Sequence, residues 1–170
     1  EVNYLDVDKY GIVNLEQLER TIKKETILIS IMHANNEIGT IEPIAEIGRI
    51  AKKYKVYFHS DTVQSIGKIR VDVKEMNLDM ISIASHKLYG PKGVGCLYVK
   101  KGTRIKPMLY GGEQEHHLRA GTENVPGIAG FGRAMELAIT DTDKENERLR
   151  RLRDMLQEGL AKRVKHIIFN

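Results

Sequence analysis

A lysine in a glycine-rich run is the residue of this sequence best suited to covalent chemistry. Lys87 stands in the segment 84–95, which reads ASHKLYGPKGVG. An ε-amine that attacks an aldehyde must be held close to it and must lose its proton easily, and a small, partly desolvated pocket meets both requirements. We therefore predict that Lys87 forms a Schiff base. The alternative is a solvated turn lysine, which is common beside glycine and proline.

A carboxylate upstream supplies the partner that this chemistry needs. Asp61 follows the apolar run 56–59, and a carboxylate at the C-terminal end of a strand can meet the ring nitrogen of a pyridine cofactor. Asp61 can equally cap the turn after it. A ligand site is favoured because several polar residues fall at the ends of predicted strands, where open α/β sheets bind ligands: Asn36, Asp61, Gln64, His86 and Lys87. Together they predict pyridoxal 5′-phosphate as the cofactor.

Four ordered motifs run through the middle of the chain. They read HANNEIG at 33–39, HSDTVQS at 59–65, SHKLYGPKG at 85–93 and RAGTEN at 119–124. This set resembles the cysteine desulfurases of the NifS and IscS type, members of the class V aminotransferases. The resemblance implies fold type I of the pyridoxal-phosphate enzymes, with this chain as the central portion of their large cofactor-binding domain. It also implies a reaction that removes sulfur from the substrate L-cysteine, leaving L-alanine and an enzyme-bound persulfide for iron–sulfur clusters or tRNA thiolation.

The resemblance makes Lys87 the catalytic residue and Asp61 a cofactor-binding residue. Lys87 would hold the cofactor and later move the α-proton of the substrate, because a released amine is a positioned base. Asp61 would keep the pyridine nitrogen protonated, and a protonated ring is the electron sink of this chemistry.

The resemblance implies that five further residues bind the cofactor. Asn36 and Gln64 would hydrogen-bond the phenolic oxygen of the ring, and Ser85 and His86 would lie near its phosphate. Thr122 would reach the phosphate of a neighbouring subunit. We therefore expect a homodimer with a shared active site, and an iron–sulfur scaffold or another sulfur acceptor protein as its partner.

The sequence departs from the family pattern in several places. Ala84 stands where a hydroxyl usually precedes the Schiff-base lysine by three residues, which leaves the nearest hydroxyls at Ser82 and Ser85. No residue matches the family's ring-stacking histidine or its mobile persulfide cysteine, so we expect this chain to be a fragment that lacks turnover alone. The single cysteine, Cys96, is predicted to be a buried structural thiol in an apolar strand, and its being alone fits a reducing compartment.

Three other functions remain open on these residues. The chain can belong to a related pyridoxal-phosphate aminotransferase or a selenocysteine lyase, or it can be a stand-alone piece that binds cofactor or a partner without turnover. The net charge of +4 also raises a nucleic-acid or scaffold role, although acidic residues interleave with the basic ones. No apolar run approaches the roughly 20 residues that span a bilayer, so we expect a cytoplasmic protein without membrane contact.

A metal site is not expected. His116 and His117 are adjacent, and adjacent residues of a strand point to opposite faces. No cluster of cysteine or aspartate accompanies them, and structural metal sites need such a set.

Strands and helices alternate along the first hundred residues, which predicts an α/β fold with a mostly parallel sheet flanked by helices. Asn14 and Gln17 resemble a capping box for a helix through Lys24. Pro43 is placed to begin a helix that ends at Tyr54. Strands are predicted at 26–32, where the strand should be buried, and at 56–59, 80–84 and 94–99, with a short segment at 69–73.

Long helices are predicted from Asn124 onward. Two apolar stripes are separated by a polar break at 140–146, which predicts two helices. The resemblance divides the chain into residues 1–138, the central and C-terminal part of the large domain, and residues 139–170, a bridging helix and the start of a small domain. Residues 164–169 would open the first strand of that small domain.

Overall fold

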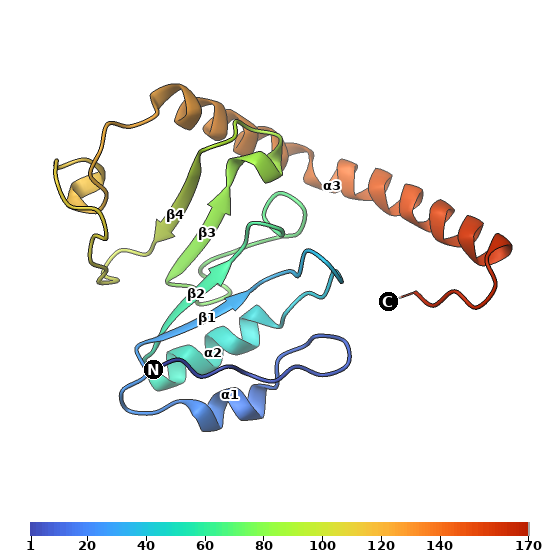
Figure 1. The fold of residues 1–170 in the computed structure, drawn as a ribbon, viewed down its shortest axis with the longest axis horizontal. Helices are drawn as coiled ribbons and strands as arrows, with labels where there is room; N and C mark the ends of the chain where they lie inside the picture. Colours follow the sequence, from blue (N-terminus) through green and yellow to red (C-terminus); the bar gives the residue numbers. More distant parts are fainter. Residues whose placement is uncertain (170) are drawn as a thin grey trace.

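The computed structural model describes residues 1–169, which form one mixed sheet with helices around it (Figure 1). The elements are α1 (Leu15–Thr21), β1 (Leu28–Met32), α2 (Ile44–Tyr54), β2 (Tyr57–Asp61), β3 (Met80–Ala84), the 3₁₀ turn η1 (Ser85–Leu88), β4 (Gly95–Val99), the 3₁₀ turn η2 (Glu115–His117) and α3 (Val125–Arg163).

The sheet has the order β1-β2-β3-β4. The first three strands are parallel, and β4 returns antiparallel to β3. The predicted α/β fold with a mostly parallel sheet is therefore confirmed. Because parallel strands run in the same direction, the segments that follow β1, β2 and β3 all leave from the carboxyl end of these strands, which we call the strand-end edge. Gly95, the first residue of β4, pairs with Ala84 at this edge.

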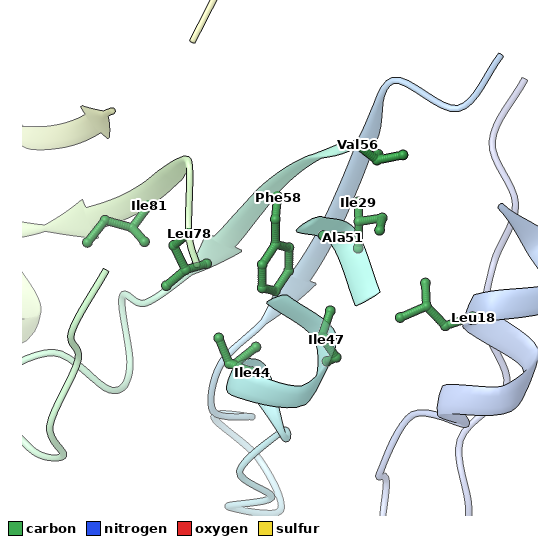
Figure 2. Packing of buried hydrophobic residues seen from close by; sticks show 9 residues of the cluster. All are labelled: Leu18, Ile29, Ile44, Ile47, Ala51, Val56, Phe58, Leu78 and Ile81. Atoms are coloured by element: carbon green, nitrogen blue, oxygen red, sulfur yellow. The ribbon is translucent and has the colours of Figure 1, made fainter. Parts of the chain in front are cut away.

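Helix α2 covers one face of the sheet and buries the main core. The ring of Phe58 on β2 points at Ile44 and Ile47 of α2, and Leu18 of α1 extends the cluster (Figure 2). Phe58 and Ile47 are completely buried. The helix predicted from Pro43 to Tyr54 is confirmed except that it begins one residue later, at Ile44, with Pro43 as its N-cap and Lys55 as a left-handed C-cap.

The opposite face of the sheet is more open. Side chains alternate between the faces of a strand, so His59 and Asp61 lie opposite to the face that carries Phe58. The strand register places Ser30 of β1 and Ser82 of β3 on the same open face.

Helix α3 is one continuous helix of 39 residues, which corrects the prediction of two helices. The polar segment 140–146 contains no glycine or proline and does not end the helix. Within it, the hydroxyls of Thr140 and Thr142 donate to the carbonyls of Glu136 and Ala138. Its first turns pack against η1, where Phe131 and Ala134 bury Leu88. Its second half extends away from the sheet (Figure 1).

Several predicted boundaries in the first half of the chain are wrong. Helix α1 ends at Thr21 rather than Lys24, because the Thr26 hydroxyl accepts a hydrogen bond from the N–H of Lys23 and a turn forms there. The Asn14 side chain caps Gln17 as predicted, but the Gln17 side chain bonds Asp6 and does not complete a capping box. The strand predicted at 26–32 was expected to be buried. Among residues 1–169, β1 is instead an outer strand of the sheet and is only partly buried.

Three further predictions are wrong nearer the C-terminus. Residues 69–73 form no strand, and neither do residues 164–169, which follow α3 as turn and coil. Cys96 is exposed rather than buried, because it lies on the edge strand β4. Partial desolvation of the thiol and the neighbouring Glu115 raise the pKa of Cys96, which disfavours the reactive thiolate.

Candidate active site

The candidate site lies at the carboxyl ends of the three parallel strands β1, β2 and β3. Strand pairing continues past the strand ends there: the N–H of His33 donates to the carbonyl of Asp61 at 2.9 Å, and the N–H of Thr62 donates to the carbonyl of Ser82 at 3.1 Å. The Thr62 hydroxyl donates to the same Ser82 carbonyl at 2.9 Å. The three segments that carry the predicted residues are therefore tied together by backbone hydrogen bonds.

Asp61 is the last residue of the central strand β2 and is half-buried. Its Oδ1 accepts the N–H of Val63 at 2.9 Å, so the carboxylate does begin the following turn, as the alternative interpretation held. Among residues 1–169, Oδ2 of Asp61 forms no hydrogen bond with another side chain. The capping role and a ligand role are compatible, because each uses a different oxygen.

Lys87 lies in η1, directly after β3. Ser85 and Leu88 are buried, whereas His86 and Lys87 are exposed. The turn is closed by hydrogen bonds from Ser85 N–H to Val94 O at 3.2 Å and from Gly90 N–H to Ser85 O at 3.1 Å. The buried residues Ser85 and Leu88 thus hold the turn in place, while the side chains of His86 and Lys87 lie on its exposed side.

The hydroxyl of Ser85 faces the interior. It is completely buried and has no hydrogen-bond partner among the described residues. A Cβ at Gly90 would lie 2.2 Å from its Oγ, so the turn packs directly onto this hydroxyl. What this segment offers a ligand is therefore the backbone and His86 rather than the Ser85 hydroxyl.

Gln64 and Lys68 form a pair that faces the lysine loop. The Nζ of Lys68 donates to Gln64 Oε1 at 3.3 Å. Burial lowers the pKa of Lys68, and the positive charge of Lys87 lowers it further. Gly67 brings them together, since a Cβ there would lie 2.6 Å from Leu88. Lys68 was missed in the sequence, where its spacing of four residues from Gln64 was the available signal.

Asn36 and Thr122 are less closely integrated. Asn36 is exposed in the turn after β1, and this turn is built by its neighbour Asn35, whose side chain accepts the N–H groups of Glu37 and Ile38. Thr122 is exposed in the segment between η2 and α3, which lies on the β4 side of the sheet (Figure 1). Within this chain, Thr122 is not brought beside the other predicted residues.

His59 is the middle residue of β2 and is hydrogen-bonded through both ring nitrogens. Its Nδ1 lies 2.8 Å from the Ser30 hydroxyl and its Nε2 lies 2.9 Å from the Ser82 hydroxyl. The spacing of two residues between His59 and Asp61 was the signal for a shared face. The serine partners depend on strand pairing.

No three His, Cys, Asp or Glu side chains in residues 1–169 gather as a metal site. His116 and His117 are exposed in η2 with left-handed backbones, not on a strand. None of the helices in that range is both long and apolar enough to cross a bilayer.

A mostly parallel sheet flanked by helices, with a long C-terminal helix, matches fold type I of the pyridoxal-phosphate enzymes, and the fold class is confirmed by the solved structures that share it. The chain belongs to the aminotransferase class-V family, whose model matches residues 1–169. This family is pyridoxal-phosphate-dependent.

Several cysteine desulfurases are similar to this chain. It is 56% identical over 170 residues to the cysteine desulfurase IscS of Dictyoglomus turgidum, covering 100% of this chain and 43% of that protein. It is 49% identical over 162 residues to the mitochondrial cysteine desulfurase of Saccharomyces cerevisiae, covering 94% of this chain and 33% of that protein. The resemblance to the NifS and IscS type is thereby confirmed, and the chain spans less than half the length of these relatives.

Two solved structures share the fold over nearly the whole chain. A NifS-like protein superimposes with a TM-score of 0.91 at 45% identity, covering 95% of this chain and 45% of that one. A NifS-like protein from Rickettsia africae gives a TM-score of 0.90 at 40% identity, covering 94% of this chain and 45% of that one.

Proposed function

We propose that this chain supplies the central part of the cofactor site of a cysteine desulfurase, which removes sulfur from L-cysteine and leaves L-alanine. One observation carries the proposal. Asp61 is the last residue of β2, and the turn that bears Lys87 follows the adjacent parallel strand β3 at the same end of the sheet. Asp61 stands directly opposite Ser82 of β3.

The donor set fits pyridoxal 5′-phosphate. Lys87 is an exposed primary amine, and the free oxygen of the half-buried Asp61 suits a protonated ring nitrogen. The cofactor would supply an electron sink that no amino-acid side chain provides.

Each residue then has a defined task. Lys87 would hold the cofactor covalently through its ε-amine and, once the substrate amine has replaced it there, the released amine would take the α-proton of the substrate. Asp61 would hold the proton on the ring nitrogen. Gln64 and Asn36 would donate to the phenolic oxygen. Lys68, which bonds Gln64, supplies an additional positive charge beside that position.

The phosphate would be bound around η1. The His86 side chain is exposed next to Lys87 and would contact the phosphate. Ala84 carries no hydroxyl and that of Ser85 is buried, so we propose a weaker hydroxyl contribution than the family pattern implies. Thr122 of a neighbouring subunit would complete the contact, which makes a homodimer part of the proposal.

The larger assembly is also proposed from the relatives. The persulfide would be passed to an iron–sulfur scaffold or another acceptor protein, and the location would be cytoplasmic, although the relative from Saccharomyces cerevisiae is mitochondrial. Residues 1–138 would belong to the large domain and residues 139–170 would lead to a smaller one. The exposed leucines beyond Ala138, among them Leu152 and Leu156, support this because they offer an apolar surface to pack on.

The test is cofactor capture by the purified chain. We expect an absorption band that saturates with added pyridoxal 5′-phosphate and, after borohydride reduction, a cofactor mass on the peptide that contains Lys87. Lys87→Ala should abolish the labelling, whereas Lys92→Ala, an exposed lysine of the same loop, should not. Labelling spread over surface lysines and unchanged in Lys87→Ala would refute the site. A second assay separates a desulfurase from a selenocysteine lyase, and it uses a longer chain that includes a persulfide cysteine. The assay compares the release of sulfide and alanine from cysteine with the release of selenide from selenocysteine.

A further inference from the structure

A histidine links three strands by its two ring nitrogens. His59 on β2 contacts the hydroxyl of Ser30 on β1 through Nδ1 at 2.8 Å and the hydroxyl of Ser82 on β3 through Nε2 at 2.9 Å. We call this set the Ser30–His59–Ser82 bridge. It crosses the open face of the sheet, opposite to the core under α2.

The strand register places the bridge immediately before Asp61. Ser30 is the direct partner of His59, whereas Ser82 is the direct partner of Asp61, two residues further along β2. The imidazole therefore reaches diagonally toward the level of the carboxylate. The carbonyl of Ser82 receives both the N–H and the hydroxyl of Thr62. Hydrogen bonds to Ser82 therefore join β2 to β3 both before Asp61, through His59, and after it, through Thr62.

The groups that face His59 come from all three strands. They are the hydroxyls of Ser30 and Ser82, the carboxylate of Asp61, and the side chain of Met80, which is the register partner of His59. Burial lowers the pKa of His59, and the charge of Asp61 opposes this without reversing it. A neutral imidazole has one donor and one acceptor nitrogen, and a hydroxyl can serve either. The bridge is therefore fully satisfied without a charge on His59.

A neutral bridge has a consequence for Asp61. Because His59 carries no charge, it does not form an ion pair that would compete for the carboxylate. Among residues 1–169, Asp61 keeps one carboxylate oxygen that accepts no side-chain hydrogen bond, and its strand is prevented from sliding against the strand that leads to Lys87.

We propose that His59 is a positioning residue, which acts through the Ser30–His59–Ser82 bridge to hold Asp61 in register with the lysine turn. The effect on cofactor binding rests on the proposed function, whereas the coupling between His59 and Asp61 does not.

The first experiment needs no cofactor. In the full chain labelled with ¹⁵N in its histidines, His59 should show a neutral imidazole at pH 7 and should titrate below the ordinary histidine value. Asp61→Asn removes a negative charge and should lower the pKa of His59 further. Ser82→Ala should change the Nε2 shift, and His117→Gln should leave all His59 signals in place. A His59 that is protonated at pH 7, or that does not respond to Asp61→Asn, would overturn the proposal.

The second experiment measures the effect on pyridoxal 5′-phosphate. His59→Phe keeps a ring but removes both nitrogens, and we expect about tenfold weaker cofactor binding together with a shifted pH profile of the bound-cofactor absorbance. His59→Gln retains one donor and one acceptor and should restore part of both. Unchanged affinity and profile in His59→Phe would contradict the positioning role. Failure of the unmodified chain to bind cofactor would instead refute the proposed function, with the histidine titration still deciding on the bridge.

Discussion

Gly90 lies directly against the buried hydroxyl of Ser85. A Cβ at Gly90 would be 2.2 Å from Ser85 Oγ and 2.9 Å from the Cβ of Ala134 on α3. The N–H of Gly90 also donates to the Ser85 carbonyl at 3.1 Å. The turn that presents Lys87 is therefore closed by a glycine that no larger residue can replace without moving the turn or the helix.

Gly90→Ala should loosen this turn. Overpacking of a filled site costs about 1–3 kcal/mol, so we expect a lower free energy of unfolding by that amount and weaker labelling of Lys87 by cofactor and borohydride. Ser85→Ala removes the nearer of the two clashing atoms and should recover part of the loss in the double variant. Gly132→Ala, in α3 with open space around it, is the control for adding a methyl group and should not lower the free energy of unfolding. A Gly90→Ala chain as stable as the unmodified one would contradict this packing.

Two helical glycines should respond in opposite directions to the same change. A Cβ at Gly48 of α2 would lie 1.9 Å from the carbonyl oxygen of Met76, whereas a Cβ at Gly159 of α3 meets nothing within 4 Å. We expect Gly48→Ala to cost about 3 kcal/mol or more, because backbone must shift. Gly159→Ala should instead stabilise by about 0.5–1 kcal/mol through helix propensity. Urea unfolding of both variants measures the difference, and equal midpoints would refute it.

Stability should fall as the pH drops below neutrality. His33 is 3% exposed, its Nδ1 has no partner among the described residues, and burial lowers its pKa. The unfolded chain takes up this proton near pH 6.5, while folded His33 takes it up only at lower pH. The unfolding free energy should therefore decrease from about pH 6.5 downward and level off below the folded pKa of His33.

A variant separates His33 from the other titrating groups. His33→Gln should flatten the decrease between about pH 6.5 and 5, leaving the part due to His59, whose pKa is also lowered. His117→Gln, at an exposed position, should keep the slope of the unmodified chain. Denaturant unfolding at several pH values makes the comparison, and an unchanged slope in His33→Gln would count against a buried neutral imidazole.

Asp61→Asn should weaken the cofactor site without unfolding it. The amide oxygen can still accept the N–H of Val63, so the turn after β2 should form. Loss of the charge removes the ion pair with the ring nitrogen, and we expect at least about tenfold lower affinity for pyridoxal 5′-phosphate, measured by absorbance titration. Asp154→Asn, in the distant half of α3, should bind as the unmodified chain does. Equal affinity in Asp61→Asn would exclude the assigned role of the carboxylate.

The sequence by itself determined the family and most of the elements. Strand 80–84 was predicted with its observed bounds, and Asp61 and Lys87 were correctly placed at the ends of neighbouring strands. These features are local: a run of apolar residues, a polar residue at its end and a glycine-rich turn are written within a few positions of one another.

Only the tertiary structure decided which partners these residues have. The Ser30–His59–Ser82 bridge joins segments that are 29 and 23 residues apart, and it exists only because three strands pair in one register. The same is true of the exposed Cys96, which needed knowledge of the sheet edge, and of the Ser85 hydroxyl, which Gly90 covers. Periodicity reports that a face is apolar or polar, but it carries no information about which other segment covers that face.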